Sequence, residues 1–495
     1  MQESVKNEHE IRLEKLQKLR KLNIHAYPEK YQRTHLACDA VKLEIGTKKI
    51  KIAGRIITKR SMGKIAFSHI LDDSGKMQIV LQEGRLAKEK FDIFNDIIDA
   101  GDFIGARGEI FKTKKGEISL LASDFTILSK ALRPLPEKWH GLKDIETRYR
   151  QRYLDILSNE GIKNVFIFRS NFIKTLREFY WNQGFIELET PILANTASGA
   201  LAKPFKTHHN ALGIDLYLRI SVGELWQKMA LIGGFEKTFE LGRVFRNEGM
   251  DPSHLQEFTA VEHYVAYWNY KDNMKFTEEM FVYLLNKLFG TLKIQIKNQN
   301  GELKEVDFAP PWKKASFRDV IKKDSGIDIE KYADKKELID ELKKKKLYDK
   351  EMDRLGLGNL IDALYKKVSR EKIIQPTFLI HHPIDVSPLA RKNDKNPRVV
   401  DRFQLLVNGW EIVNAYSELI DPLDQKERFK EQAQAKAKGD EEAHGEDKDF
   451  ITALEHGAPP MSGWGMGIDR MVALLTHQEN LRDVVLFPAL RPESE

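Results

Sequence analysis

The 495-residue sequence contains a single cysteine, Cys38, and no long apolar segment. One cysteine excludes an internal disulfide and any zinc site built from several cysteines. No stretch approaches the roughly 18 uninterrupted apolar residues of a membrane-spanning helix. The N-terminus alternates charged residues and has no apolar signal core, so we expect a protein that is not exported and works in a reducing cytoplasm.

Charge is unevenly distributed along the chain, although the net charge is only +6. Residues 1–130 hold 25 Lys and Arg against 18 Asp and Glu, whereas the remaining residues hold 55 against 56. A basic N-terminal module beside a near-neutral remainder predicts contact with a phosphate backbone. A solvated lysine-rich surface explains the same counts equally well, so charge alone leaves both interpretations open.

Length and patterning predict an α+β multidomain protein. Residues 3–23 are predicted to form an amphipathic helix, in which Leu13, Leu16, Leu19 and Leu22 recur every three positions. Five short β-type runs with turn signals and one helical stretch then predict a small five-stranded barrel of the OB type. The expected parts are an N-terminal helical segment (1–48), the OB-fold β-barrel (49–130), a linker (131–148) and a large α+β domain (149–495) with a lysine-rich helical insertion at about 325–372.

Two arginines at distant positions suit a polyphosphate ligand. Arg246 lies in Phe-Arg-Asn-Glu, and Arg470 follows Gly-Met-Gly-Ile-Asp at the start of a helix. The glycines would let the backbone lie close against a flat ligand, although such a motif alone is usually just a tight turn. A guanidinium is a planar fork that binds two phosphate oxygens at once, and a helix N-terminus also favours anions. For either motif alone, a surface arginine in a salt bridge is the better interpretation.

Two predicted strands carry polar and aromatic residues on one face each, because side chains alternate along a strand. If the two faces meet, Glu262 and Glu418 lie in one pocket, where a pair of carboxylates would receive an ammonium group. Each strand alone could instead be a half-exposed, amphipathic edge strand. The two sets are Phe258, Glu262 and Tyr264, and Asn414, Tyr416 and Glu418.

In series, these motifs resemble those of class II lysyl-tRNA synthetases over nearly the whole chain. The matching stretches are residues 52–55, 148–155, 199–205, 207–212, 245–249, 387–390, 417–419, 452–455 and 463–488. The resemblance implies a class II antiparallel-sheet catalytic domain and ATP-dependent ligation of L-lysine to tRNA(Lys). The reaction would pass through a lysyl-adenylate and release AMP and pyrophosphate.

The resemblance also assigns roles to individual residues. Arg246 would hold the α-phosphate and Arg470 the γ-phosphate of a bent ATP, which makes these two the catalytic residues. The implied ATP-binding set is Arg246, Glu248, His254, Phe258, Glu411, Gly467 and Arg470. The implied lysine-binding set is Gly199, Glu224, Glu262, Tyr264, Asn414, Tyr416 and Glu418.

Further implications concern metal, RNA and assembly. Glu411 would bind Mg²⁺, and the segment around Pro191 would form the seam of a homodimer. Anticodon reading would fall to Phe67, Gln78 and Glu117, since single-stranded bases are read by stacking and hydrogen bonds. From the sequence alone, Phe67 is equally plausible as a barrel core residue.

The chain departs from the family pattern at three places. Gln404 stands where the family usually has a second metal-binding glutamate, and a neutral oxygen weakens a hard-cation site. The usual Ala-Pro-Glu appears as Ser221-Val222-Gly223-Glu224, which is one residue longer. The Asn-Pro of the second motif is replaced by Leu255-Gln256. The number of Mg²⁺ ions therefore stays open.

Two rival functions remain to be weighed. An aspartyl or asparaginyl enzyme shares the barrel and motifs, but an acidic substrate side chain needs cationic partners, and the chain offers Glu262 and Glu418 instead. A synthetase-derived RNA-binding protein without catalysis would have lost one or both arginines, whereas this sequence retains Arg246 and Arg470.

Overall fold

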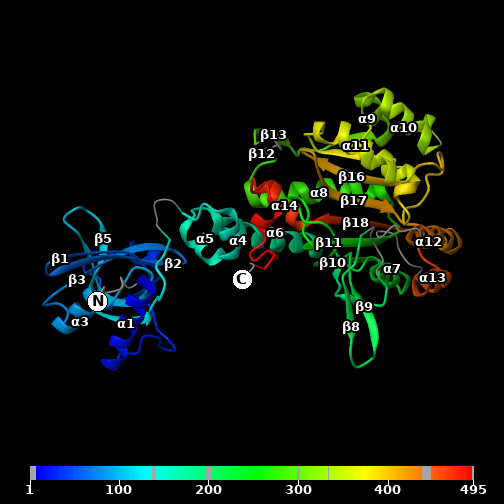
Figure 1. The fold of residues 1–495 in the computed structure, drawn as a ribbon. Coiled ribbons are helices and arrows are strands. Elements are labelled where there is room, and N and C mark those ends of the chain that lie inside the picture. The colour runs from blue at the N-terminus through cyan, green and yellow to red at the C-terminus, as the bar shows by residue number, and fades with distance from the viewer. Residues whose placement is uncertain are drawn as a thin grey trace, which may run out of the picture. The chain divides into compact units, whose positions relative to one another are not determined.

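The computed structural model describes residues 7–136, 141–196, 202–297, 301–332, 334–437 and 447–492. The chain divides into two compact units, Met1–Asp144 and Ile145–Glu495 (Figure 1). No helix within the described ranges combines the length and apolarity that crossing a bilayer takes.

The first unit is built around a closed five-stranded barrel with the strand order β1-β2-β3-β5-β4, which confirms the predicted OB-fold. Neighbouring strands pair antiparallel except β3 and β5, whose parallel pairing completes the barrel. The elements of this unit are α1 (Glu8–Lys21), α2 (Ala37–Ala40), β1 (Ile50–Met62), β2 (Ile65–Asp72), β3 (Gly75–Gln82), α3 (Lys88–Asp96), β4 (Phe103–Lys112) and β5 (Ile118–Ser129).

Helix α1 starts later than its leucine pattern predicts. Asn7 accepts a hydrogen bond from the Glu10 N–H, and the Glu10 side chain accepts one from the Asn7 N–H. This capping box satisfies two backbone donors that a helix N-terminus leaves unpaired, and so fixes the first helical residue at Glu8. Leu16 and Leu19 are buried in the barrel's core cluster.

The second unit contains an eight-stranded sheet in the order β14-β15-β16-β17-β18-β11-β10-β6. All neighbours are antiparallel except the outermost pairs, β14 with β15 and β6 with β10. The strands are β6 (Ile186–Glu187), β10 (Lys237–Phe245), β11 (Glu257–Ala266), β14 (Lys313–Ser316), β15 (Thr377–Ile380), β16 (Arg402–Val407), β17 (Trp410–Ser417) and β18 (Met461–Gly467).

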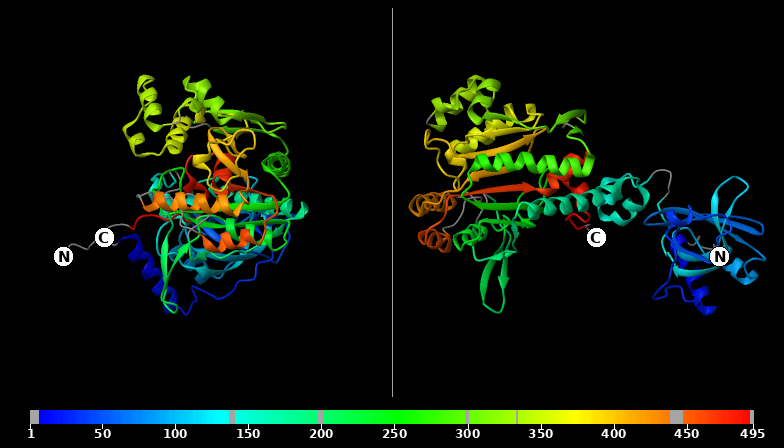
Figure 2. Two further views of the ribbon diagram at one scale, coloured as in Figure 1. Left: turned by 90° about the vertical axis from the view of Figure 1, so that its right-hand side faces the viewer. Right: turned by 180° about the vertical axis from the view of Figure 1, so that it is seen from behind.

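One face of this sheet packs on three helices, α6 (Ile162–Asn182), α8 (Tyr270–Phe289) and α14 (Ile468–Leu475). The rear view in Figure 2 shows α6 and α8 running along that face. Val261, Val413 and Trp464 point into the shared core from neighbouring strands. Because side chains alternate along a strand, the residues between them point to the opposite face.

The remaining elements surround the sheet. The insertion forms its own apolar cluster, in which α10 buries Leu338 and Leu342 and exposes its lysine-rich side. These elements are α4 (Ile145–Arg150), α5 (Arg152–Ser158), β7 (Leu193–Ala194), β8 (Lys206–His209), β9 (Ile214–Leu218), α7 (Glu224–Ile232), β12 (Lys293–Lys297), β13 (Leu303–Asp307), α9 (Phe317–Ser325), η1 (Ile329–Lys331), α10 (Lys335–Lys344), η2 (Lys350–Arg354), α11 (Leu357–Val368), η3 (Arg370–Lys372), η4 (Ile384–Val386), α12 (Pro422–Ala437), α13 (Lys448–Glu455) and η5 (Leu481–Val484).

Candidate active site

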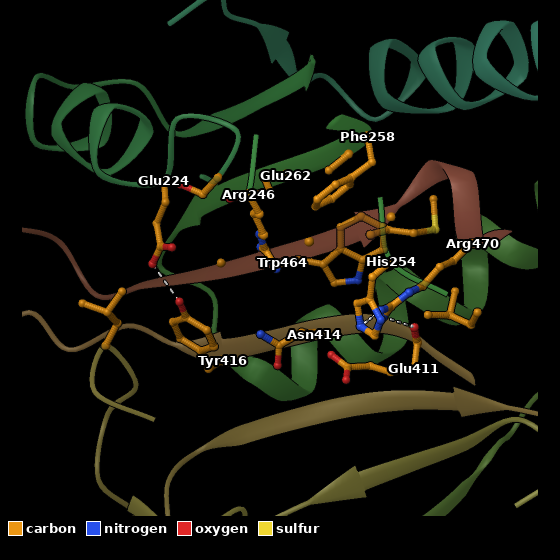
Figure 3. A pocket seen from close by; sticks show the side chains of 18 of the residues that line it. Glu224, Arg246, His254, Phe258, Glu262, Glu411, Asn414, Tyr416, Trp464 and Arg470 are labelled. Carbon is orange, nitrogen blue, oxygen red and sulfur yellow. Dashed lines mark hydrogen bonds between the residues drawn. The ribbon is translucent and has the colours of Figure 1, made fainter. Parts of the chain in front are cut away.

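A cavity of about 370 Å³ lies on the polar face of β11, β17 and β18 (Figure 3). Most of the residues expected to bind ATP or lysine line it, although they come from segments far apart in the sequence. These are Glu224, Arg246, Glu248, His254, Phe258, Glu262, Tyr264, Glu411, Asn414, Tyr416, Gly467 and Arg470. Gly199 lies outside the described residues.

The two arginines both face this cavity. Arg246 follows β10, where its Nε donates to the Ile220 carbonyl at 3.3 Å and its guanidinium lies 5.2 Å from the Phe258 ring centre. Arg470 lies in the first turn of α14, where Nη1 donates weakly to the Glu411 carbonyl at 3.4 Å. Arg470 Nη2 lies 3.4 Å from His254 Nε2. Two such cations in one cavity favour an anionic ligand.

Burial lowers the pKa of Arg470, and Glu411 opposes this effect, while Arg370 and Arg246 lower the pKa further. The cationic groups are therefore close enough to repel one another. A bound polyanion would relieve both the repulsion and the loss of hydration.

The glycine-rich stretch before α14 is a strand rather than the tight turn that such a motif usually forms. Gly463, Gly465 and Gly467 occupy alternate positions of β18 and line the cavity, while Trp464 and Met466 belong to the core. A Cβ at Gly463 would collide with Glu418 and Tyr264, and one at Gly465 would lie 3.3 Å from Glu262 Cγ. Glycine is needed here for close approach of neighbouring side chains, not for a turn.

A bulge places Glu411 on the cavity side of β17. The pairing steps from Leu405 opposite Val413 to Leu406 opposite Glu411, so Ile412 is an extra residue on this strand. The shift puts Glu411 on the face that also carries Asn414, three positions away, which simple alternation does not predict. Both residues line the cavity.

Gln404 does not line the cavity. Gln404 belongs to β16, the strand next to β17, and its Oε1 lies 3.0 Å from Nε2 of the buried His382. The described part of the chain holds no group of three or more His, Cys, Asp or Glu side chains arranged to bind a metal. Of the two residues expected to bind a metal, only Glu411 lines the cavity, which is compatible with Mg²⁺ held mainly by phosphate and water oxygens.

Glu262 is satisfied by protein partners. Its Oε1 accepts a hydrogen bond from the Val222 N–H at 2.8 Å, and its Oε2 accepts one from the Tyr264 hydroxyl at 3.1 Å. Val222 belongs to the segment that is one residue longer than the family pattern. Burial and the nearby Glu224 raise the pKa of Glu262, while these hydrogen bonds and Arg246 lower it. Glu262 thus orients Tyr264 rather than presenting a free carboxylate.

Glu418 does not line the cavity, contrary to the expectation that it shares an open pocket with Glu262. It follows the end of β17, is 2% exposed, and lies against Gly463 at the cavity wall. Burial raises the pKa of Glu418, and Glu224 and Glu262 add to this, whereas Lys228 lowers it. The two carboxylates are close enough to interact electrostatically, and Glu418 Oε1 lies where a Cβ of the cavity-lining Gly463 would be.

Sequence reasoning missed Lys228 and Arg402. Lys228 Nζ lies 2.7 Å from Glu224 Oε1, and the four-residue spacing on α7 was the available signal. Arg402 lines the cavity, and its Nε donates to Asn414 Oδ1 at 2.8 Å. Asn414 therefore turns its oxygen toward Arg402 and keeps its NH₂ group for a ligand. No local sequence signal identified Arg402.

In the first unit, the predicted anticodon residues lie on neighbouring strands and turns. Gln78 Nε2 donates to Glu117 Oε2 at 2.9 Å, and His69 Nε2 lies 3.1 Å from Glu117 Oε1. Phe67 is partly exposed and is not part of the barrel's core cluster. The sequence-based prediction did not include His69, although it lies two residues after Phe67 and therefore on the same face of β2.

Comparison with known proteins agrees with both units. The family model "tRNA synthetases class II (D, K and N)" matches residues 144–491, and the model "OB-fold nucleic acid binding domain" matches residues 50–128. A lysine–tRNA ligase of Carboxydothermus hydrogenoformans is 47% identical over 484 residues, which cover 97% of each chain.

Two further relatives named lysine–tRNA ligase have similar sequence identity to this chain. The one from Aquifex aeolicus is 48% identical over 446 residues, covering 90% of this chain and 74% of the relative. The one from Bacillus cereus is 43% identical over 494 residues, covering 98% of this chain and 97% of the relative. The chain therefore belongs to the class II tRNA synthetases of the D, K and N group.

Proposed function

We propose that this protein uses ATP to attach L-lysine to tRNA(Lys) through a lysyl-adenylate, with release of AMP and pyrophosphate. The observation that carries the proposal is the separation of charge in one cavity. Figure 3 shows Glu224 and Tyr416 toward one end and Arg470, His254 and Glu411 toward the other, with Arg246 between them. This arrangement suits an amino acid and a triphosphate that meet near Arg246.

The first step joins lysine to the nucleotide. A lysine carboxylate oxygen attacks the α-phosphorus, the bond to the bridging oxygen of the β-phosphate breaks, and pyrophosphate leaves. Arg246 stabilises the charge that develops on the α-phosphate, and Arg470 holds the γ-phosphate. Phe258 provides an aromatic surface for the adenine beside Glu248, His254 and Gly467.

The second step transfers lysine to RNA. A hydroxyl of the terminal tRNA ribose attacks the acyl carbon, and AMP leaves with the electrons of the broken mixed-anhydride bond. No protein nucleophile is required, because both attacking groups belong to substrates. Catalysis therefore rests on positioning and on fixed charges in a water-poor cavity.

The acidic end of the cavity selects lysine. Glu224 binds the α-ammonium group, and Glu418 with Tyr264 receives the ε-ammonium group, while Asn414 and Tyr416 complete the wall. An aspartate or asparagine side chain would bring no second ammonium group to Glu418, and the aspartate carboxylate would be repelled by the buried carboxylates. The relatives that cover nearly the whole chain are also lysine–tRNA ligases.

Mg²⁺ would be held by Glu411 together with oxygens of ATP. When bound, the ion neutralises phosphate charge and helps to orient the leaving group. Gln404 is occupied by His382 and contributes no ligand in this arrangement. We therefore expect the chain to supply a single carboxylate to the metal.

The proposal also covers RNA binding and assembly. Phe67, Gln78 and Glu117 read the anticodon from the barrel. Apolar side chains near Pro191 are exposed, as expected for the seam of a homodimer, namely Trp181 (54%), Ile186 (50%), Ile192 (45%) and Leu193 (47%). Since its substrates are tRNA and ATP, the enzyme would work in the cytoplasm.

Amino-acid-dependent exchange of pyrophosphate into ATP tests this function. Exchange with lysine alone among the twenty amino acids supports it, and Arg470→Ala should abolish that exchange. Lys275→Met is a matched control, because Lys275 is an exposed lysine of α8 that does not line the cavity. Exchange with aspartate or asparagine, or no exchange with any amino acid, would overturn the proposal.

A further inference from the structure

We infer that Lys228 is a positioning residue for amine recognition, which holds one oxygen of Glu418 and leaves the other for the substrate ammonium group. The inference rests on the proposed function and adds a residue that touches no substrate. It starts from the ammonium group of Lys228, which lies between the carboxylates of Glu224 and Glu418.

Lys228 Nζ bridges two separate parts of the chain. It lies 2.7 Å from Glu224 Oε1, one turn earlier on α7, and 2.6 Å from Glu418 Oε2 beyond the end of β17. All three side chains are at most 4% exposed. Of these three residues, Glu224 lines the cavity, whereas Lys228 and Glu418 do not.

Aromatic rings enclose the same ammonium group. Nζ lies 5.6 Å from the ring centre of Tyr264 and 5.8 Å from those of Tyr416 and Phe450. The Tyr416 hydroxyl also donates to Glu224 Oε1 at 2.7 Å. Rings of this kind attract a cation and restrict its movement, so Lys228 is held in one place.

The two oxygens of Glu418 have different surroundings. Both oxygens are buried and lack a hydrogen bond among the described residues, but Oε2 forms the ion pair with Lys228 at 2.6 Å, whereas no ion pair reaches Oε1. Oε1 lies against Gly463, which itself lines the cavity. A buried carboxylate oxygen without a donor is costly, and an entering ammonium group would satisfy it.

The number of charges supports this assignment of Glu418 Oε2 to Lys228 and of Oε1 to the substrate. Glu224, Glu262 and Glu418 are three carboxylates, whereas a lysine substrate brings two ammonium groups. With Lys228 as the third cation, the total charge of the three ammonium groups balances that of the three carboxylates. Burial lowers the pKa of Lys228, but Glu224 and Glu418 more than offset this and raise it, so Lys228 stays charged.

Removal of this cation should change how Glu418 titrates. The titratable groups around it are Glu224 on α7, Glu262 and Tyr264 on β11, Tyr416 on β17, and Glu418 itself. Without Lys228, burial and the neighbouring carboxylates would raise the pKa of Glu418 further. A protonated Glu418 binds an ammonium group poorly, so lysine affinity would become pH-dependent.

The experiment compares Lys228→Met with Lys275→Met, the control on an exposed helix surface, in lysine-dependent pyrophosphate exchange. We expect the lysine KM of Lys228→Met to rise at least tenfold while its ATP KM stays within twofold of the wild-type value. The lysine KM of Lys228→Met should keep falling above pH 8, whereas the wild-type value levels off there because the pKa of its Glu418 is about 8. An unchanged lysine KM, or equal changes in both KM values, overturns the inference.

A double-mutant cycle with Glu418→Gln tests whether Lys228 acts through Glu418. Lys228→Met should raise the lysine KM little or not at all in the Glu418→Gln background, and independent, multiplicative effects would refute the inference. If Lys228→Met does not fold, Lys228→Gln replaces it in the same assays, because a glutamine can still bond to Glu224. Failure of wild-type lysine exchange would instead refute the proposed function.

Discussion

Replacement of Gly463 by alanine should damage lysine binding while leaving ATP binding intact. A Cβ at this position would collide with Glu418 Oε1 and would lie 2.5 Å from Tyr264 Cε1. Neither neighbour is free to retreat. Glu418 is paired with Lys228, and the Tyr264 hydroxyl is bonded to Glu262. The methyl group must therefore displace both groups proposed to receive the ε-ammonium group.

The size of the effect follows from overpacking. Adding a methyl group to a filled site typically costs about 1–3 kcal/mol. If the strain falls on the lysine-binding geometry, the lysine KM should rise by roughly 5- to 150-fold, since 1.4 kcal/mol corresponds to a factor of ten. The ATP KM should change by less than about twofold, because the collision involves only groups at the acidic end.

Gly467→Ala is the matched control on the same face of β18. A Cβ there would lie 4.0 Å from the Arg470 Cβ, which is an ordinary contact. Its effect should be small, and it should fall on the ATP KM rather than on the lysine KM. Both variants are measured by pyrophosphate exchange, with chemical unfolding to confirm that each is folded. A normal lysine KM for Gly463→Ala, or the same shifts in both variants, would refute this reasoning.

Three further outcomes are expected. Glu418→Gln should raise the lysine KM by about 10- to 100-fold, since hydrogen bonds to charged groups contribute about 1.5–3 kcal/mol, and should spare the ATP KM; equal changes in both would count against its role. Phe67→Ala should leave lysine-dependent exchange normal but impair tRNA charging, and normal charging by a stable variant would contradict anticodon reading. Burial lowers the pKa of His263 to about 3, so below pH 6.5 the unfolded chain binds a proton that the folded chain does not. Urea unfolding should therefore show stability falling as the pH drops from 6.5 to 5, by up to about 1.4 kcal/mol per pH unit from this residue, and His263→Gln should remove that part of the slope.

Much of the fold could be predicted because its determinants are local. The five short β-type runs and their turn signals indicated the barrel, which the structure and the family model confirm. The alternation of side chains along a strand placed Phe258, Glu262 and Tyr264 on one face of β11, and all three line the cavity. Boundaries that depend on side-chain caps, such as the start of α1 directly after the Asn7 cap, were harder to predict from the sequence.

Other features required the tertiary structure, because they depend on partners that are distant in sequence. The bulge at Ile412 is visible only from the pairing of β16 with β17, and it decides that Glu411 faces the cavity. Gly463 is small because Glu418 packs against it, forty-five positions away, so its pattern resembled a turn.

The sequence by itself determined the class of protein and the residue types of the site, since strand alternation and short motifs are written in consecutive residues. Only the tertiary structure decided how the acidic end is arranged. It showed that Glu262 is engaged by Val222 and Tyr264, and that Lys228 pairs with Glu418. The physical reason is that burial and ion pairing depend on which strands and helices meet, and no local pattern records that.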